Sequence, residues 1–334
     1  MGWLFSEMAK IWDFLMDPGF MFSPLYLPST VLIVYFVWVL RGRETGFLQF
    51  LAPRKLYRHP STLVDLKVTV FNLFFFSSSL MAALYITPVV TYRLLALLSG
   101  VAETGAIIEA TTWQRGLAAA VILFLVEDFI RYLNHYLHHR APVLWPFHAV
   151  HHSAEVLTPV TFLRGHPVYY MIQRIFTSFI AGAVQAALLF LVIGQIEFWV
   201  LYSGVFAFQV YVFLGAHIRH SHIPLRYGRI AEHILISPAQ HQIHHSADPK
   251  HFDKNFGEIF ALWDWMFGTL YIPNGKEDLI YGVGDKEGRR LAQPYPTLRA
   301  ALFKPFVESA HAFRQILFPP KQIDGSLLSV KKEQ

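Results

Sequence analysis

Residues 135–152 read HYLHHRAPVLWPFHAVHH, and residues 241–245 read HQIHH. The first stretch holds six histidines in 18 residues, and eight more lie in the 35 residues from His217 to His251. These two windows hold 14 of the 17 histidines, and the chain contains no cysteine. Disulfides, iron–sulfur clusters, thiolate zinc sites and cysteine nucleophiles are therefore excluded. Any metal site in this chain must use imidazole or carboxylate ligands.

The spacing of the histidines indicates metal ligands. Asp128, Tyr132, His135 and His139 follow one another at steps of four, three and four residues, which places them on one helix face. An HxxHH string occurs at 148–152 and again at 241–245. Neutral imidazole binds iron, copper, zinc and nickel, and one tetrahedral metal needs about four ligands. The strings supply eight, which predicts two metal ions: His135, His139, His148, His151, His152, His241, His244 and His245.

Other polar residues have more ordinary explanations. A single histidine pair at a helix end is usually solvated, and only the coincidence of three strings favours a metal. His59, His233 and His311 are expected to be structural or surface residues, whereas His138 and His251 adjoin the strings and are candidates to support ligands. Asp128 has two interpretations. It either pairs with Arg131 or accepts the second ring N–H of a ligand such as His135.

The composition suits a bilayer, since 54% of residues are hydrophobic, 16% are aromatic and 15% are charged. A helix crosses a membrane with about 20 mostly apolar residues. About five such segments are expected, near 24–40, 68–89, 116–134, 175–193 and 196–216. The stretch from Val89 to Leu98 either extends the second segment or forms a short re-entrant piece. Residues 1–15 are expected to form an amphipathic surface helix.

The distribution of Lys and Arg predicts the orientation of these segments. The loop after the first segment carries six basic residues, whereas the loop from about 90 to 115 carries only Arg93 and Arg115. Since cytoplasmic loops are enriched in Lys and Arg, the first loop is expected to be cytoplasmic, and alternation then places both histidine windows there. The predicted fold class is an all-α integral membrane protein whose cytoplasmic helical cap holds a His-rich dimetal site. The net charge of +5 is spread along the chain, which argues against nucleic-acid binding.

The order HxxxH, HxxHH and HxxHH resembles the fatty acid hydroxylase and sterol desaturase superfamily of membrane di-iron enzymes. The resemblance extends to HHSAE at 151–155, TFLRGHP at 161–167, DKNFG at 253–257, LWD at 262–264 and FGT at 267–269. It covers roughly residues 120–270. The family also has a ligand in a His-x-Asn context. His220 fits that position with His222 in place of the asparagine, and whether His217 or His222 also binds metal stays open.

The resemblance implies a specific chemistry. Two iron ions would activate O2 and remove hydrogen from an unactivated C–H bond of a membrane lipid, followed by hydroxylation or by formation of a double bond. It implies nine metal ligands, the eight above and His220, with Asp128 and Tyr132 as candidate catalytic residues. No nucleotide-binding fingerprint with the right context is found, so the electrons are expected from a separate cytochrome b5-like or ferredoxin-like donor.

The expected organisation has three parts. Residues 1–110 hold the amphipathic helix and the first two spans, 111–272 the catalytic domain, and 273–334 a cytoplasmic segment with a helix at 297–317 and a tail from about 320. The missing cysteines favour a bacterial inner membrane, whereas the final KKEQ resembles a dilysine signal of the endoplasmic reticulum. The sequence does not set the oligomeric state.

Hydroxylation is the favoured activity, and desaturation is the alternative within the family. The alternatives from other functional classes are a metal transporter, a zinc hydrolase and an inactive relative. A His-rich metal transporter would place its ligands near the bilayer midplane, whereas these histidines follow the spans. A membrane zinc hydrolase would need an HExxH string, which the sequence lacks. An inactive relative with a structural metal is distinguished only by measuring iron and O2 consumption.

Overall fold

The computed structural model describes residues 2–17, 20, 23–77, 79–100, 112–193, 198–275 and 277–319. These residues form helices, turns and loops, and their only β pairing is three isolated bridges. The α-helices are α1 (Gly2–Met16), α2 (Leu27–Leu40), α3 (Phe47–Leu51), α4 (Arg54–Tyr57), α5 (Pro60–Phe76), α6 (Ser79–Ala83), α7 (Thr87–Ser99), α8 (Thr112–Arg140), α9 (Trp145–His152), α10 (Pro167–Leu188), α11 (Phe198–Phe213), α12 (Pro238–His244), α13 (Leu262–Met266) and α14 (Leu298–Leu317). Short 3-10 turns η1 (Pro24–Tyr26), η2 (Pro159–Leu163), η4 (Ala216–Ile218), η5 (Ala231–His233) and η6 (Pro249–His251) and a π turn, η3 (Leu189–Ile193), connect or extend them. The predicted all-α class is confirmed.

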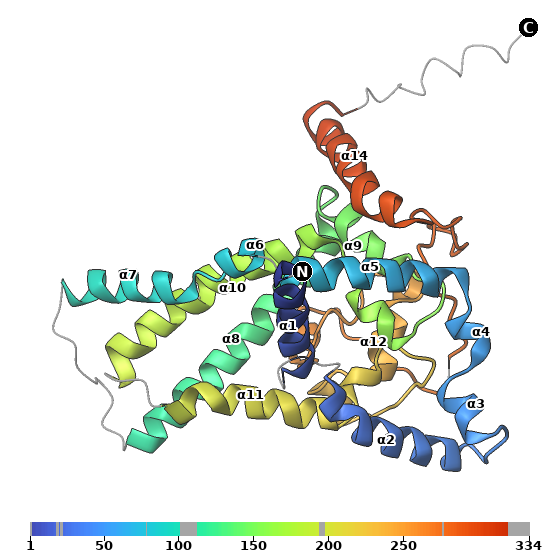
Figure 1. Cartoon of the computed structure of the whole chain (residues 1–334), viewed down its shortest axis with the longest axis horizontal. Helices are drawn as coiled ribbons and strands as arrows, with labels where there is room; N and C mark the ends of the chain where they lie inside the picture. Colours follow the sequence, from blue (N-terminus) through green and yellow to red (C-terminus); the bar gives the residue numbers. More distant parts are fainter. Residues whose placement is uncertain are drawn as a thin grey trace, which may run out of the picture.

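Four of the longer helices extend away from the rest of the molecule. Helix α10 packs against α7 and α8, and α11 packs against α8. Figure 1 shows the far ends of α7, α8, α10 and α11 on the left, while α5, α9, α12 and α2 lie toward the right. Helices α8 and α10 thus each have one end beside the segments that carry the histidine strings.

Two helices in the described part of the chain are long and apolar enough to cross a membrane, Leu80–Ser99 and Pro167–Leu191. Pro24–Leu40 is apolar but shorter. The predicted segments at 116–134, 175–193 and 196–216 fall largely within α8, α10 with η3, and α11. The number of spans and their orientation stay predictions.

The predicted boundaries of the second segment, 68–89, are wrong. Helix α5 ends at Phe76, and a separate apolar stretch continues from Leu80 to Ser99. The interruption follows Ser77, whose Oγ donates to the Phe74 carbonyl at 3.0 Å and so competes with the backbone hydrogen bonds of the helix. The stretch Val89 to Leu98 therefore belongs to the helix after this break.

Both terminal helices form as expected. Helix α1 covers the predicted residues, while its place on the surface stays a prediction. Helix α14 begins at Leu298, where the Thr297 side chain accepts a hydrogen bond from Ala300 N at 3.1 Å. The tail expected from about 320 lies outside the described residues.

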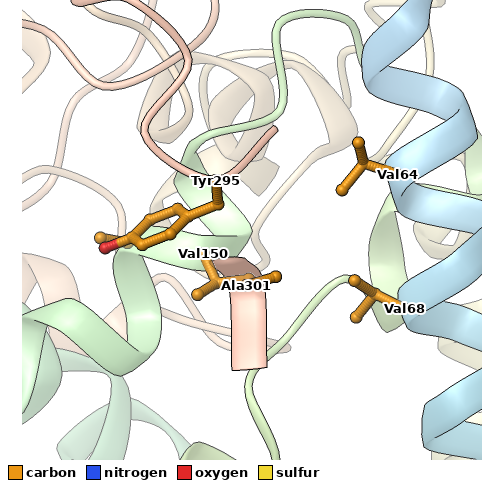
Figure 2. Close-up of a cluster of buried hydrophobic side chains, with 6 residues drawn as sticks. Val64, Val68, Val150, Tyr295 and Ala301 are labelled. Carbon is orange, nitrogen blue, oxygen red and sulfur yellow. The ribbon is translucent and has the colours of Figure 1, made fainter. Parts of the chain in front are cut away.

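A hydrophobic cluster fixes the position of α9, the helix that carries His148, His151 and His152. The cluster joins three parts of the chain in one buried group. It contains Val64 and Val68 of α5, Ala149 and Val150 of α9, Tyr295, and Ala301 of α14. Figure 2 shows Val150 among Tyr295, Ala301 and the two valines. Because α9 is only eight residues long, its conformation depends on this packing.

A buried ion pair completes the anchoring of α9. The Arg164 guanidinium and the Asp65 carboxylate are both fully buried and in contact. Arg164 also donates to the Val150 carbonyl at 2.9 Å and to Ser153 Oγ at 2.8 Å. One side chain thus ties the C-terminal end of α9 to α5.

Replacing Asp65 by Ala should destabilise the protein by about 3–5 kcal/mol, because it leaves the Arg164 charge buried without its partner. The matched control is Asp285→Ala, which breaks the ion pair with Arg289, a side chain that is 75% exposed. Such surface pairs contribute about 0.2–1 kcal/mol. Thermal unfolding in detergent measures both; equal shifts for the two variants would contradict the assigned role of Arg164.

Candidate metal centre

The first two histidine strings lie on consecutive helices. His135 and His139 occupy the last turns of α8, and His148, His151 and His152 occupy α9. Pro146 stands in the first turn of α9, where a missing backbone N–H is not needed. All five residues are buried except His139, which is partly buried. The short connection from Arg140 to Trp145 brings the two helices together.

The third string lies on α12, whose start is defined by its sequence. The Ser237 side chain accepts a hydrogen bond from Gln240 N, and the Gln240 side chain accepts one from Ser237 N at 2.9 Å. This capping box, with Pro238 in the first turn, fixes where the helix begins. His241 and His244 therefore lie in the final turn, and His245 caps the helix.

The nine predicted ligands gather into two adjoining groups. Within each group, the potential ligand atoms all lie within 4.8 Å of one another. Group one contains His135, His139, His148, His152 and His244, and group two contains His151, His220, His241 and His245. The groups adjoin, since the rings of His152 and His245 stack with centroids 4.6 Å apart.

Helix geometry explains how each HxxHH string is divided. Residues four apart lie on one helix face, so His148 and His152 enter group one, whereas His241 and His245 enter group two. The middle histidine of each HxxHH string belongs to the other group, so that His151 enters group two and His244 enters group one. Each string therefore contributes to both groups.

The spacing of the nitrogens fits bound metal ions. His152 Nε2 lies 3.1 Å from the Nε2 atoms of both His139 and His148. In group two, His220 Nε2 lies 3.1 Å from His151 Nε2 and His245 Nε2 and 2.9 Å from His241 Nε2. Two nitrogens bound at right angles to a metal, each at about 2.1 Å, would be about 3 Å apart.

Backbone carbonyls orient two ligands of group one. His135 Nδ1 donates to the Phe256 carbonyl, and His244 Nδ1 donates to the Lys254 carbonyl, both at 2.7 Å. A carbonyl only accepts, so the proton of each ring lies on Nδ1 and Nε2 is left with its lone pair. Both Nε2 atoms are buried without a hydrogen-bond partner in the structure. This is the arrangement of a metal-binding imidazole with a carbonyl partner behind it.

Burial also keeps the ligands in the metal-binding form. Desolvation lowers the pKa of His135 and of His151 to about 3. It likewise lowers the pKa of His148 and His152 well below the usual 6.5, and neighbouring imidazoles lower it further. At neutral pH these rings are uncharged, as metal ligands must be.

An irregular segment after α12 holds the two carbonyls in place. The Asp264 carboxylate accepts from Phe256 N at 2.8 Å, Gly257 N at 2.7 Å and Thr269 Oγ1 at 2.6 Å. Gly257 is required here, because a Cβ would lie 2.5 Å from the Phe260 carbonyl oxygen. Asn255, at φ +57°, donates to the Gln240 and Tyr271 carbonyls and accepts from Tyr271 N. The sequence motifs that include Asn255 and Asp264 indicated their importance but not these contacts.

The expected hydrogen bond between Asp128 and His135 is wrong. Asp128 lies seven residues before His135, about 10 Å along the helix, which is too far for contact. Its carboxylate instead accepts from Ile259 N and Phe260 N at 3.1 Å and from Trp263 Nε1 at 2.9 Å. Asp128 thus joins α8 to the segment before α13, and Arg131 approaches Glu127 and Glu258 instead.

The Tyr132 hydroxyl lies 3.3 Å from Thr269 Oγ1, so Tyr132 contacts the segment that follows α13. These contacts give Asp128 and Tyr132 positioning roles. A direct part of either residue in catalysis stays a prediction.

The remaining histidines have other partners. His217 Nε2 lies 2.6 Å from Thr30 Oγ1, and His222 Nε2 donates to the Phe50 carbonyl at 2.7 Å. His138 Nδ1 donates to the Asn134 carbonyl, and His251 contacts Glu277 at 2.9 Å. Neither His217 nor His222 belongs to either group. His59 caps α5, where its ring accepts a hydrogen bond from Ser61 N, as expected of a structural residue.

A cavity of about 480 Å³ leads to the two groups. His135 and His148 of group one and His151, His220 and His241 of group two line it. Elsewhere its walls include many aromatic rings, contributed by Phe14, Phe20, Phe76, Tyr85, Phe162, Tyr169, Tyr170 and Phe208. A cavity of this kind accommodates a largely apolar ligand beside the histidines.

Comparison with known families agrees with this site. Residues 120–269 match the fatty acid hydroxylase family model. The similarity to the fatty acid hydroxylase and sterol desaturase superfamily that the sequence predicts is confirmed over this region. All nine grouped histidines lie within the matched fatty acid hydroxylase region.

Several curated proteins are similar to this chain. Human alkylglycerol monooxygenase is 28% identical over 78% of this chain and 49% of its own length. The ornithine lipid hydroxylase OlsE of Rhizobium tropici is 30% identical over 54% of this chain and 52% of its own. A Delta(7)-sterol 5(6)-desaturase of Aspergillus fumigatus is 24% identical over 54% and 60%. The chain spans about half the length of the first two, and no solved structure matches it.

Replacing Asp264 by Asn should weaken metal retention by about tenfold or more, because the amide N–H2 would face the N–H groups of Phe256 and Gly257 and displace the carbonyl behind His135. Asp285→Asn is the matched control, since Asp285 also accepts from two backbone N–H groups, those of Glu287 and Arg289, in an exposed turn. Metal remaining after a chelator challenge is measured by mass spectrometry. Equal loss in both variants would argue against the role of Asp264.

Proposed function

We propose that this protein is an O2-dependent membrane di-iron oxygenase that hydroxylates a C–H bond of a membrane lipid. The observation that supports this most is the pair of adjoining all-histidine groups at the end of an aromatic-walled cavity. Nine neutral imidazoles suit two iron ions, with His135, His139, His148, His152 and His244 around one and His151, His220, His241 and His245 around the other. Bound iron would supply the activation of O2.

The overall reaction has a definite balance. One oxygen atom enters the C–H bond to give an alcohol, and the other leaves as water after two electrons and two protons are supplied. The protein contributes a dry cavity that holds the substrate carbon beside the histidines and excludes side reactions with water. The electrons would come from a separate cytochrome b5-like or ferredoxin-like donor. We propose that such a donor approaches near Arg140, which follows His139 directly, pairs with Asp253 and is 55% exposed.

A lipid substrate is supported by the names of the relatives, which are an alkylglycerol monooxygenase, an ornithine lipid hydroxylase and a sterol desaturase. The two apolar helices support a membrane location, with the histidine groups on the cytoplasmic face by the distribution of Lys and Arg. We propose a bacterial inner membrane, or the endoplasmic reticulum membrane if the source is eukaryotic.

Desaturation is the second candidate, favoured by the similarity to the Aspergillus sterol desaturase. In that reaction two hydrogens leave the substrate and both oxygen atoms leave as water, with the same two electrons and two protons. The product would therefore lose two hydrogens instead of gaining one oxygen.

Purified protein should contain about two iron ions per chain. Replacing His220 by Ala should lower this to about one, because His220 contacts the other three members of group two and none of group one. His233→Ala is the control, since His233 bonds only to the Arg229 carbonyl at an exposed position. Iron is measured by plasma mass spectrometry; a His220→Ala protein that keeps two irons contradicts the assignment of group two.

Expression of the gene should create a new lipid that contains one additional oxygen atom, detected by untargeted lipid mass spectrometry. His244→Ala should reduce this product at least a hundredfold, because it removes a group-one ligand. The His233→Ala variant should leave the product unchanged. A lipid that has lost two hydrogens would support the desaturase alternative. If neither product forms and the purified protein contains no iron, both the hydroxylase and the desaturase proposals are refuted.

A further inference from the structure

Charged side chains of both signs line the otherwise aromatic cavity. Glu127 and Arg131 lie on α8, Arg174 on α10, and Glu258 on the segment before α13. Charges in such a setting are costly, and a ligand that pairs with them is the usual reason for their presence. The metal groups do not use any of these four side chains.

The charges in the cavity are only loosely paired with one another. Arg131 lies 4.0 Å from the Glu127 carboxylate and 3.9 Å from the Glu258 carboxylate, and these side chains are 29%, 42% and 30% exposed. A formed charge-assisted hydrogen bond is about 2.7–2.9 Å long. The pair Arg226–Glu232 elsewhere in the structure reaches 2.9 Å. The cavity charges thus retain hydrogen-bonding capacity for a ligand.

A third arginine of the cavity behaves differently. Arg219 donates to the Ala216 and Glu258 carbonyls and to the Tyr211 hydroxyl, and it is buried. Its donors therefore serve the protein. The Arg174 guanidinium, by contrast, lies over the Tyr85 ring at 5.4 Å, a contact that leaves its N–H groups able to bind an anion.

We propose that Glu127, Arg131, Arg174 and Glu258 bind the headgroup of a zwitterionic lipid, with its cation near the carboxylates and its anion near the guanidiniums. Among the side chains that retain hydrogen-bonding capacity, two are carboxylates and two are guanidiniums, so both charges of such a headgroup meet an opposite charge. This inference rests on the proposed function, since it takes the cavity as the substrate site.

The position of these residues also constrains where the lipid is oxidised. Arg131 and Glu127 lie one and two turns before the ligand His135 on the same helix face, about 6 and 12 Å along the axis. A headgroup held there brings the nearby carbons to the histidines. The new oxygen should therefore lie within a few carbons of the polar end and not at the far end of an acyl chain.

Lipid retention by the purified full-length protein tests the proposal without turnover. Phosphatidylcholine, phosphatidylglycerol and diacylglycerol with identical acyl chains are compared by native mass spectrometry under anaerobic conditions. We expect phosphatidylcholine to bind about tenfold more tightly than the anionic or the neutral lipid. Glu127→Gln and Arg174→Gln should each abolish this preference, whereas Arg229→Gln, at an exposed position, should preserve it.

Iron content and thermal stability of each variant are measured in parallel, so that misfolding is distinguished from lost recognition. The inference is overturned if the three lipids bind equally or if phosphatidylglycerol or diacylglycerol binds more tightly. It is also overturned if folded Glu127→Gln and Arg174→Gln proteins still prefer phosphatidylcholine. If the preference holds but no oxidised lipid forms, only the proposed function fails. If oxidised lipid forms without the preference, only this inference fails.

Discussion

The structure depends on placing many unprotonated imidazole nitrogens face to face in a buried space. Lone pairs at about 3 Å repel unless a cation lies between them, and burial disfavours protonation of the rings as a remedy. A metal ion at each group would resolve this conflict. Three features hold this otherwise unfavourable arrangement in place. They are the hydrophobic cluster around Val150, the ion pair between Arg164 and Asp65, and the hydrogen bonds of Asp264.

The two strings and the pair on α8 show how little secondary structure such a centre needs. Helices α9 and α12 have eight and seven residues, too few to be stable alone. Their starts are set by local sequence, with proline in the first turn of both and a capping box at Ser237. Their mutual position depends instead on contacts from irregular segments, whose carbonyls lie behind His135 and His244. Seven of the nine predicted ligands are on helices, whereas His220 and His245 lie just outside them. The carbonyls that orient His135 and His244 are on loops.

The sequence predicted the parts of the fold that have a period or a repeated string. The helical class, the final helix and eight of the nine grouped histidines follow from spacing, whereas His220 is predicted only from the family resemblance. The predicted bounds of the second apolar segment are wrong, because the end of α5 depends on a local hydrogen bond of Ser77. Asp128 was assigned the wrong partner because a shared helix face does not imply contact between residues two turns apart. The contact of Arg164 with Asp65 joins residues 99 apart in the chain. Neither this contact nor the hydrogen bonds within residues 253–271 has a periodic signal in the sequence, so only the folded structure reveals them.

The division of the strings has a consequence for how the protein is made. Group one takes four ligands from residues 135–152 and one, His244, from the later string, whereas group two takes three from residues 220–245 and one, His151, from the earlier string. During synthesis, the first four ligands of group one emerge long before any of group two except His151. The order of emergence favours loading of group one first, with the second ion captured only when the later segment arrives. Each ion would then join two distant stretches of chain, so that binding of the second ion coincides with the docking of residues 220–245 against residues 135–152.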